Sequence, residues 1–134
     1  MLNLSVPALR RVLWLDASSG LAMALAHFGM SGQLSRWLGL PPAWLLVSGL
    51  VVLGAALLSG SLAWRAAPPA AGVRLLAVGN FGWVAASVWA VWGAGLALTT
   101  LGVAWVLAQA AFVLVLAELE WAGSRRAPAI LMGA

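Results

Sequence analysis

Apolar residues along the chain gather in four long runs, which short polar or proline-containing stretches separate. The runs cover about residues 12–30, 43–63, 73–96 and 101–121. Each is close to the ~20 residues that a helix needs to cross ~30 Å of hydrocarbon. Because unpaired backbone amides are costly in lipid, each run is expected to be helical. The pattern predicts an all-α fold in which residues 1–134 form one membrane domain, a four-transmembrane-helix bundle in up-down-up-down order.

The connection between the first two runs, "SGQLSRWLGLPPAW", has two interpretations. In one, it forms a short interfacial helix with Leu34, Trp37 and Leu38 on its apolar face. Gln33 and Arg36 would then point outward. In the other, it is an ordinary loop that Trp37 anchors.

The composition supports the assignment to a membrane. The chain is 64% hydrophobic and 7% charged, whereas a soluble domain is about 25% charged and at most about half apolar. Such a chain lacks the polar residues to cover its own surface, so we expect the lipid bilayer to surround it. The absence of cysteine excludes disulfides, thiolate metal sites and cysteine nucleophiles.

Arginines set the predicted orientation. The chain has seven Lys+Arg residues, all of them arginine, against three acids. Only Arg36 lies on one side of the predicted bundle. The six other arginines lie on the opposite side: Arg10, Arg11, Arg65, Arg74, Arg125 and Arg126. By the positive-inside rule both termini are cytoplasmic, and the bacterial inner membrane is the expected location. Because these arginines flank apolar runs, they indicate topology, and no nucleic-acid partner is expected.

In this orientation, tryptophans are expected near both membrane surfaces. Three of them are expected in a cytoplasmic belt, namely Trp14, Trp64 and Trp121. Four others are expected toward the outer face, namely Trp37, Trp44, Trp92 and Trp105.

Polar residues inside the runs recur on single helix faces and at matching depths. Residues 11 apart lie only ~20° apart around a helix, as do Asp16 and His27, Ser48 and Ser59, and Gln109 and Glu120. At ~1.5 Å per residue, a cytoplasmic-side polar layer falls ~7–9 Å inside the nearest arginine: Asp16, Ser59, Asn80 and Glu120. An outer polar layer falls ~24–25 Å away: His27, Ser48 and Gln109. Each layer has two interpretations: its residues hold the helices together by packing and hydrogen bonding, or they line a functional site.

Glu118 and Glu120 are close in sequence, yet different surroundings are expected for them. Glu120 shares the polar face and would approach Asp16, so a shared proton or an arginine partner, Arg11 or Arg74, is expected. Glu118 belongs to the same candidate layer by depth but lies ~160° away around the helix. There it either meets another helix, for example from a second protomer, or extends to the headgroups.

His27 is the single histidine of the chain, and Met23 and Met30 flank it on the same helix face. Two thioethers and an imidazole suit Cu(I). A haem would need a second strong axial ligand, which the sequence does not offer. Alternatively, His27 hydrogen-bonds to Gln109 or Ser48 and the methionines fill gaps. We expect no cofactor, with copper, haem or a quinone at His27 as the alternatives.

The segments "RWLGLPPAWLL", "RLLAVGNFGWVAASVW" and "LGVAWVLAQAAFVLVLAELEW" resemble a group of small bacterial four-span integral membrane proteins of unassigned function. The resemblance covers most of the chain. It implies a compact helical bundle in the inner membrane and carries no catalytic residues over to this chain.

The sequence contains no serine–histidine–acid arrangement, HExxH motif or glycine-rich phosphate loop, so an enzyme is not expected. The first functional hypothesis is a non-enzymatic accessory or scaffold subunit, in contact with lipid, a second copy or another membrane protein. The alternative is a small proton- or cation-coupled transporter or permeation module, with Asp16, Asn80 and Glu120 as its responsive layer. The third is ligand binding at His27.

Overall fold

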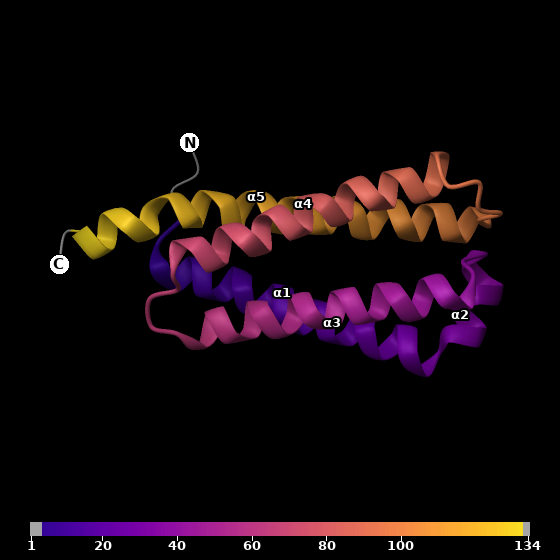
Figure 1. Ribbon diagram of the computed structural model, residues 1–134, viewed down its shortest axis with the longest axis horizontal. Helices are drawn as coiled ribbons and strands as arrows, with labels where there is room; N and C mark the ends of the chain where they lie inside the picture. The colour runs from indigo at the N-terminus through magenta and orange to yellow at the C-terminus, as the bar shows by residue number, and fades with distance from the viewer. Residues whose placement is uncertain (1–3, 133–134) are drawn as a thin grey trace.

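The computed structural model describes residues 4–132, with side chains described up to Arg125. It is an all-α bundle, as predicted (Figure 1). The part of the chain that the structure describes forms five helices: α1 (Val6–Gly29), α2 (Ser31–Leu38), α3 (Pro42–Trp64), α4 (Ala70–Trp92) and α5 (Thr100–Met132).

Three of these helices, α3, α4 and α5, are long and apolar enough to cross a membrane, with mean hydropathies of 2.2, 1.5 and 2.1. The chain is therefore a multi-pass membrane protein. Helix α1 has 24 residues but is not among the three, since Asp16, Ser18, Ser19 and His27 lower its hydropathy. That the run at residues 12–30, in α1, also crosses the membrane stays a prediction.

The four long helices pair into two hairpins. Helix α1 packs along α3 and α4 packs along α5, whereas contact between the pairs is much sparser and runs from α1 to α5 and from α3 to α4 (Figure 1). Within the first pair, a Cβ at Gly20 would lie 3.2 Å from Ala56 Cβ, and one at Gly49 would lie 3.1 Å from His27 Cβ. We call α1–α2–α3 the first hairpin and α4–α5 the second.

The apolar core lies at one end of the bundle. It consists of six buried residues from α1, α3 and α4: Leu9, Leu13, Leu62, Ala63, Val73 and Leu76. At this end the described chain begins and ends, and the connection between α3 and α4 turns (Figure 1). Arginine residues of α1, α4 and α5 lie here too, while Arg36 lies in α2 at the opposite end. Arg126 is in α5, but its side chain lies outside the described residues.

The first connection contains a helix, so the short-helix interpretation is confirmed by α2. Gln33 and Arg36 are exposed and Leu38 is 5% exposed, as predicted. Trp37, however, is 52% exposed and does not share the burial of Leu38. The helix ends at Gly39, which has a φ of 78° and takes the left-handed conformation that glycine adopts without strain.

Two helix ends differ from the predicted runs. Helix α4 ends at Trp92 and not at residue 96, because Gly93 and Ala94 both donate their amide protons to the Trp89 carbonyl, and Gly95 has a φ of 69°. Two glycines here let the chain leave the helix early. Helix α5 continues beyond the predicted end at Trp121 to Met132.

Near α2, backbone atoms join the two hairpins in what we call the α2 clamp. The Thr99 amide donates to the Leu38 carbonyl at 3.0 Å, and the Thr99 hydroxyl donates to the Trp37 carbonyl at 2.6 Å. Both segments approach through glycine: a Cβ at Gly39 would lie 2.9 Å from the Thr99 nitrogen, and one at Gly102 would collide with the Leu38 carbonyl. The clamp therefore requires glycine at both positions.

Candidate functional site

Three polar side chains from three helices meet in the interior and form what we call the acid centre. Asn80 Nδ2 of α4 donates to Asp16 Oδ2 of α1 at 3.1 Å and to Glu120 Oε2 of α5 at 2.9 Å. Glu120 is completely buried, and Asp16 and Asn80 are 8% and 6% exposed. The structure thus brings together three residues of the predicted cytoplasmic-side layer.

The acid centre contains more acceptors than donors. Glu120 Oε1 is buried and has no hydrogen-bond partner among the described residues. The arginines that the sequence suggested as partners lie elsewhere: Arg11 is exposed, and Arg74 Nε donates to Ser124 Oγ at 3.3 Å. Two adjacent buried carboxylates without a cation have a lower free energy when they share a proton.

Two other residues of that predicted layer do not join the acid centre. Ser59 is completely buried and donates its hydroxyl to the Leu13 carbonyl at 2.7 Å, so it ties α3 to α1. Glu118 is exposed on the other side of α5, as are Ala104 and Ala111. The acid centre is therefore smaller than the predicted layer.

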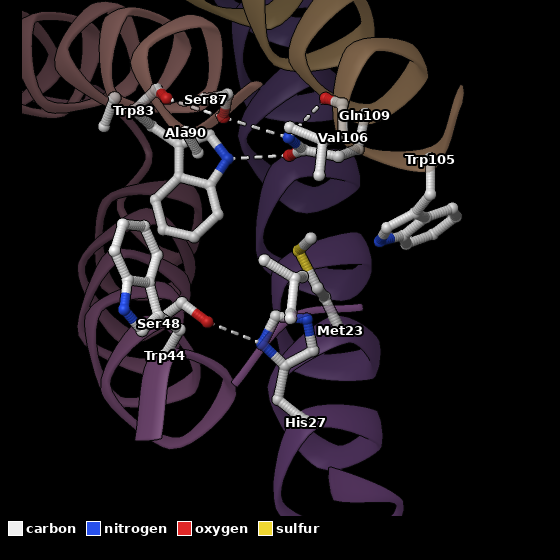
Figure 2. Close-up of a pocket in the computed structure, with 12 residues that line it drawn as sticks. Met23, His27, Trp44, Ser48, Trp83, Ser87, Ala90, Trp105, Val106 and Gln109 are labelled. Carbon is white, nitrogen blue, oxygen red and sulfur yellow. Dashed lines mark hydrogen bonds between the residues drawn. The ribbon is translucent and has the colours of Figure 1, made fainter. Parts of the chain in front are cut away.

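Toward the α2 end, residues of all four long helices line a partly open chamber of about 130 Å³, shown in Figure 2. We call it the indole chamber, because its walls include Trp44 of α3, Trp83 of α4 and Trp105 of α5. The residues predicted for the outer polar layer all line it: His27, Ser48 and Gln109.

A wider groove of about 640 Å³ lies between α3 and α4, and we call it the α3–α4 groove. It shares four lining residues with the indole chamber: Trp44, Ser48, Trp83 and Ala86. Its other lining residues include Val47 and Val51, which are 61% and 56% exposed, and the exposed Gly79 and Gly82. The chamber and the groove therefore adjoin at these residues, where α3 and α4 face each other.

Gln109 fixes one wall of the chamber and uses all its polar atoms to do so (Figure 2). Its Oε1 accepts from Trp83 Nε1 at 2.7 Å, and its Nε2 donates to Ser87 Oγ at 3.0 Å and to the Val106 carbonyl at 2.7 Å. Ser87 in turn donates to the Trp83 carbonyl at 2.8 Å. Gln109 thus orients Trp83 and keeps no free donor for a ligand.

His27 presents one ring nitrogen to the chamber. Ser48 Oγ lies 2.9 Å from His27 Nδ1 and also donates to the Leu45 carbonyl at 3.0 Å. A serine hydroxyl has one proton, and Ser48 donates it to the Leu45 carbonyl. The hydrogen between Ser48 and His27 is therefore carried by Nδ1, which donates to Ser48 Oγ. Nε2 then carries a lone pair, and in Figure 2 this nitrogen points into the chamber.

Two of the three candidate metal ligands line the indole chamber. Met23 lines the indole chamber with His27, but Met30 does not and is 37% exposed. Among the described residues, no group of three histidine, cysteine or acidic side chains could hold a metal ion. Copper binding by Met23, His27 and Met30 stays a prediction.

Sequence reasoning missed the part that Trp83 plays. This residue lies three positions after Asn80 and four before Ser87, which places it on the polar face of α4. That spacing was a signal, because an indole N–H on a polar face inside a membrane needs an acceptor. Gln109 supplies it.

Comparison of this chain with protein-family models, with curated proteins and with solved structures finds no match. The resemblance to small bacterial four-span proteins remains a prediction, and the fold and the two polar sites rest on the chain's own geometry.

Proposed function

We propose that this protein is a small, non-enzymatic, proton-responsive transport module of the bacterial inner membrane. The observation that carries the proposal is the position of Asn80, whose amide links Asp16 of the first hairpin to Glu120 of the second. A protonation change at this point acts directly on the contact between the hairpins.

The proposal includes a fourth span, with both termini on the cytoplasmic side. Helix α1 supports this because it packs along α3, a helix long and apolar enough to cross the membrane. The arginines support it as well, since they gather at the end of the bundle where the chain begins and positive residues favour the cytoplasmic side.

The arrangement of hydrogen bonds supports movement of one hairpin against the other. Among the described side chains, every hydrogen bond between the hairpins lies either in the α2 clamp or in the acid centre. The indole chamber lies between these two points. Two closely packed units with sparser contact between them can shift as rigid bodies and so open or close the space between them.

The direction of the pH effect follows from proton counting. In the closed arrangement the acid centre holds a shared proton, whereas carboxylates that reach water after opening release it at neutral pH. The closed state therefore binds more protons, so it is favoured at low pH and loses stability as the pH rises.

The pH dependence of the contact between the hairpins is determined by the groups that the four long helices bring to the acid centre. Helix α1 contributes Asp16, α4 contributes Asn80 and α5 contributes Glu120. Helix α3 has no titratable side chain and presents Ser59, which is bonded to Leu13. The nearest cation of α4, Arg74, is engaged with Ser124.

Tryptophan fluorescence tests the proton response. In a His27→Gln background, which removes the imidazole, the emission is expected to change between about pH 5 and about pH 8 as the hairpins separate around the chamber indoles. Asp16→Asn and Glu120→Gln, which mimic the protonated acids, are expected to abolish the change. The matched control is Glu118→Gln, an exposed acid on the same helix, which should keep it. A response that survives in the first two variants would rule out the acid centre as its source.

Vesicles test the transport step. Purified protein is reconstituted with a pH-sensitive dye inside, and a pH gradient is imposed. The protein is expected to dissipate the gradient faster than empty vesicles, and Asp16→Asn is expected to reduce the excess rate about tenfold or more. Equal rates in empty and protein-containing vesicles would contradict the transport proposal.

One observation favours a second candidate, an accessory or scaffold subunit. Glu118 is exposed on α5, a helix long and apolar enough to cross a membrane, and shares its face with the exposed Ala104 and Ala111, small residues that let another helix approach closely. This candidate predicts a stable partner in mild detergent that Ala111→Leu displaces. If the protein purifies alone with its pH response intact, this candidate is excluded.

A further inference from the structure

We propose that the indole chamber binds the head group of a lipid-soluble phenol or quinol: one uncharged aromatic ring that bears a hydroxyl group. The tail of the molecule lies in the α3–α4 groove. The inference rests on the proposed function only in naming a class of cargo, because binding at His27 is measured separately from transport.

The sizes of the two spaces indicate a ring and a tail. The chamber has a volume of about 130 Å³, and an apolar protein cavity of about 150 Å³ holds one benzene ring. The adjoining groove of about 640 Å³ is much larger than a ring and runs between two helices toward lipid. A molecule with one ring and an apolar chain matches this pair of volumes.

The chamber walls select against charge. Its lining is dominated by Met23, three indoles and small apolar residues, and the imidazole is the single acidic or basic side chain among the described residues that line it. A charged head group would lose its hydration there without gaining a counter-ion. Gln109 and Ser87 already bond to each other and to Trp83. A neutral aromatic ring can stack on the indoles, which is the favoured contact between such groups.

His27 specifies a hydrogen-bond donor on the ring. The residue is 4% exposed, its Nδ1 is bonded to Ser48, and no hydrogen bond of Nε2 to any described residue is present. Because Nε2 faces the chamber with a lone pair, a ligand hydroxyl can donate to it. An ether of the same shape cannot.

Two glycines of α4 keep the route from lipid open. A Cβ at Gly79 or Gly82 would meet no atom within 4 Å, and both residues line the α3–α4 groove. A leucine there would extend into the groove without displacing the backbone. A Cβ at Gly54 of α3 would likewise meet no atom within 4 Å, yet Gly54 does not line the groove, so Gly54→Leu is a matched control.

The single histidine makes the test specific, since ¹⁵N-histidine labelling gives the signal of one residue. The protein in lipid nanodiscs is titrated with 4-heptylphenol and, separately, with 4-heptylanisole, its methyl ether. The free protein is expected to show a protonated Nδ1 and an unprotonated Nε2. The phenol should shift the Nε2 signal in a saturable way, and the anisole should bind about tenfold more weakly, since it lacks the hydrogen bond.

Variants separate entry through the groove from partition into lipid. Gly82→Leu and Gly79→Leu are each expected to weaken phenol binding about tenfold or more by filling the groove, while Gly54→Leu leaves it unchanged. Glu118→Gln, an exposed position outside both spaces, should also leave binding unchanged. Because binding is read from the histidine signal and transport from vesicles, failure of transport and failure of binding are distinguishable. Equal binding of phenol and anisole, a protonated Nε2 in the free protein, or no saturable shift would each overturn the proposal.

Discussion

Replacement of Asn80 by leucine is expected to destabilise the folded protein by about 3 kcal/mol, because it leaves the carboxyl groups of Asp16 and Glu120 buried without their shared amide donor. The free energy of unfolding is measured by denaturant titration in detergent micelles, with tryptophan fluorescence as the signal. An Asn80→Leu protein as stable as the unmodified chain would show that the acid centre has little energetic weight.

A triple variant then separates function from packing. Asp16→Leu, Asn80→Leu and Glu120→Met together replace the whole acid centre by apolar side chains, which in buried ionic clusters is often neutral or stabilising. We expect stability near that of the unmodified protein and loss of the pH response. If the triple variant were as unstable as Asn80→Leu alone, the role of the acid centre would be to hold the helices of the bundle together.

Gly102→Ala is expected to destabilise the protein by about 1–3 kcal/mol. The new Cβ would collide with the Leu38 carbonyl, which accepts the Thr99 amide, so the α2 clamp has to break or the helices have to move apart. The change in the midpoint of thermal unfolding, recorded in the same detergent, measures the effect.

The matched control for this substitution is Gly54→Ala. This glycine is also inside a helix, but a Cβ there would meet no neighbouring atom. Alanine is a better helix former than glycine by about 1 kcal/mol, so this variant should be equal or more stable. The same loss of stability in both variants would mean that the close approach at Leu38 does not determine the effect of Gly102→Ala.

The acid centre was predictable because helix geometry fixes both the direction and the depth of a side chain. Asp16, Asn80 and Glu120 lie at the same distance from their flanking arginines and on the polar face of their helices, and they meet in the structure. The same reasoning included Ser59, which instead bonds to a neighbouring carbonyl. Depth alone cannot distinguish a serine that faces the centre from one that satisfies the backbone beside it.

The indole chamber was not predictable, because it depends on how the helices pair. Nothing in the periodicity indicates that α1–α3 and α4–α5 pack closely while the space between the pairs stays partly open. Trp44 and Trp105 were expected toward the outer face, but no sequence pattern indicated that both would line one chamber. The close approach at Gly39 and Gly102 likewise joins segments that are distant in sequence, so no local pattern reveals it.

The distance between the two hairpins is the most direct measure of whether protonation controls their contact. A chain without cysteine suits site-directed spin labelling, which measures this distance. One pair of labels, at Leu50 of α3 and Val88 of α4, spans the hairpins; a second pair, at Val88 and Leu101 of α5, lies within one hairpin. All three positions are exposed. We predict that the first distance lengthens as the pH rises from about 5 to about 8, that the second stays constant, and that Asp16→Asn holds the first at its low-pH value. A first distance that does not change with pH, or one that still changes in Asp16→Asn, would contradict a proton-controlled contact between the hairpins.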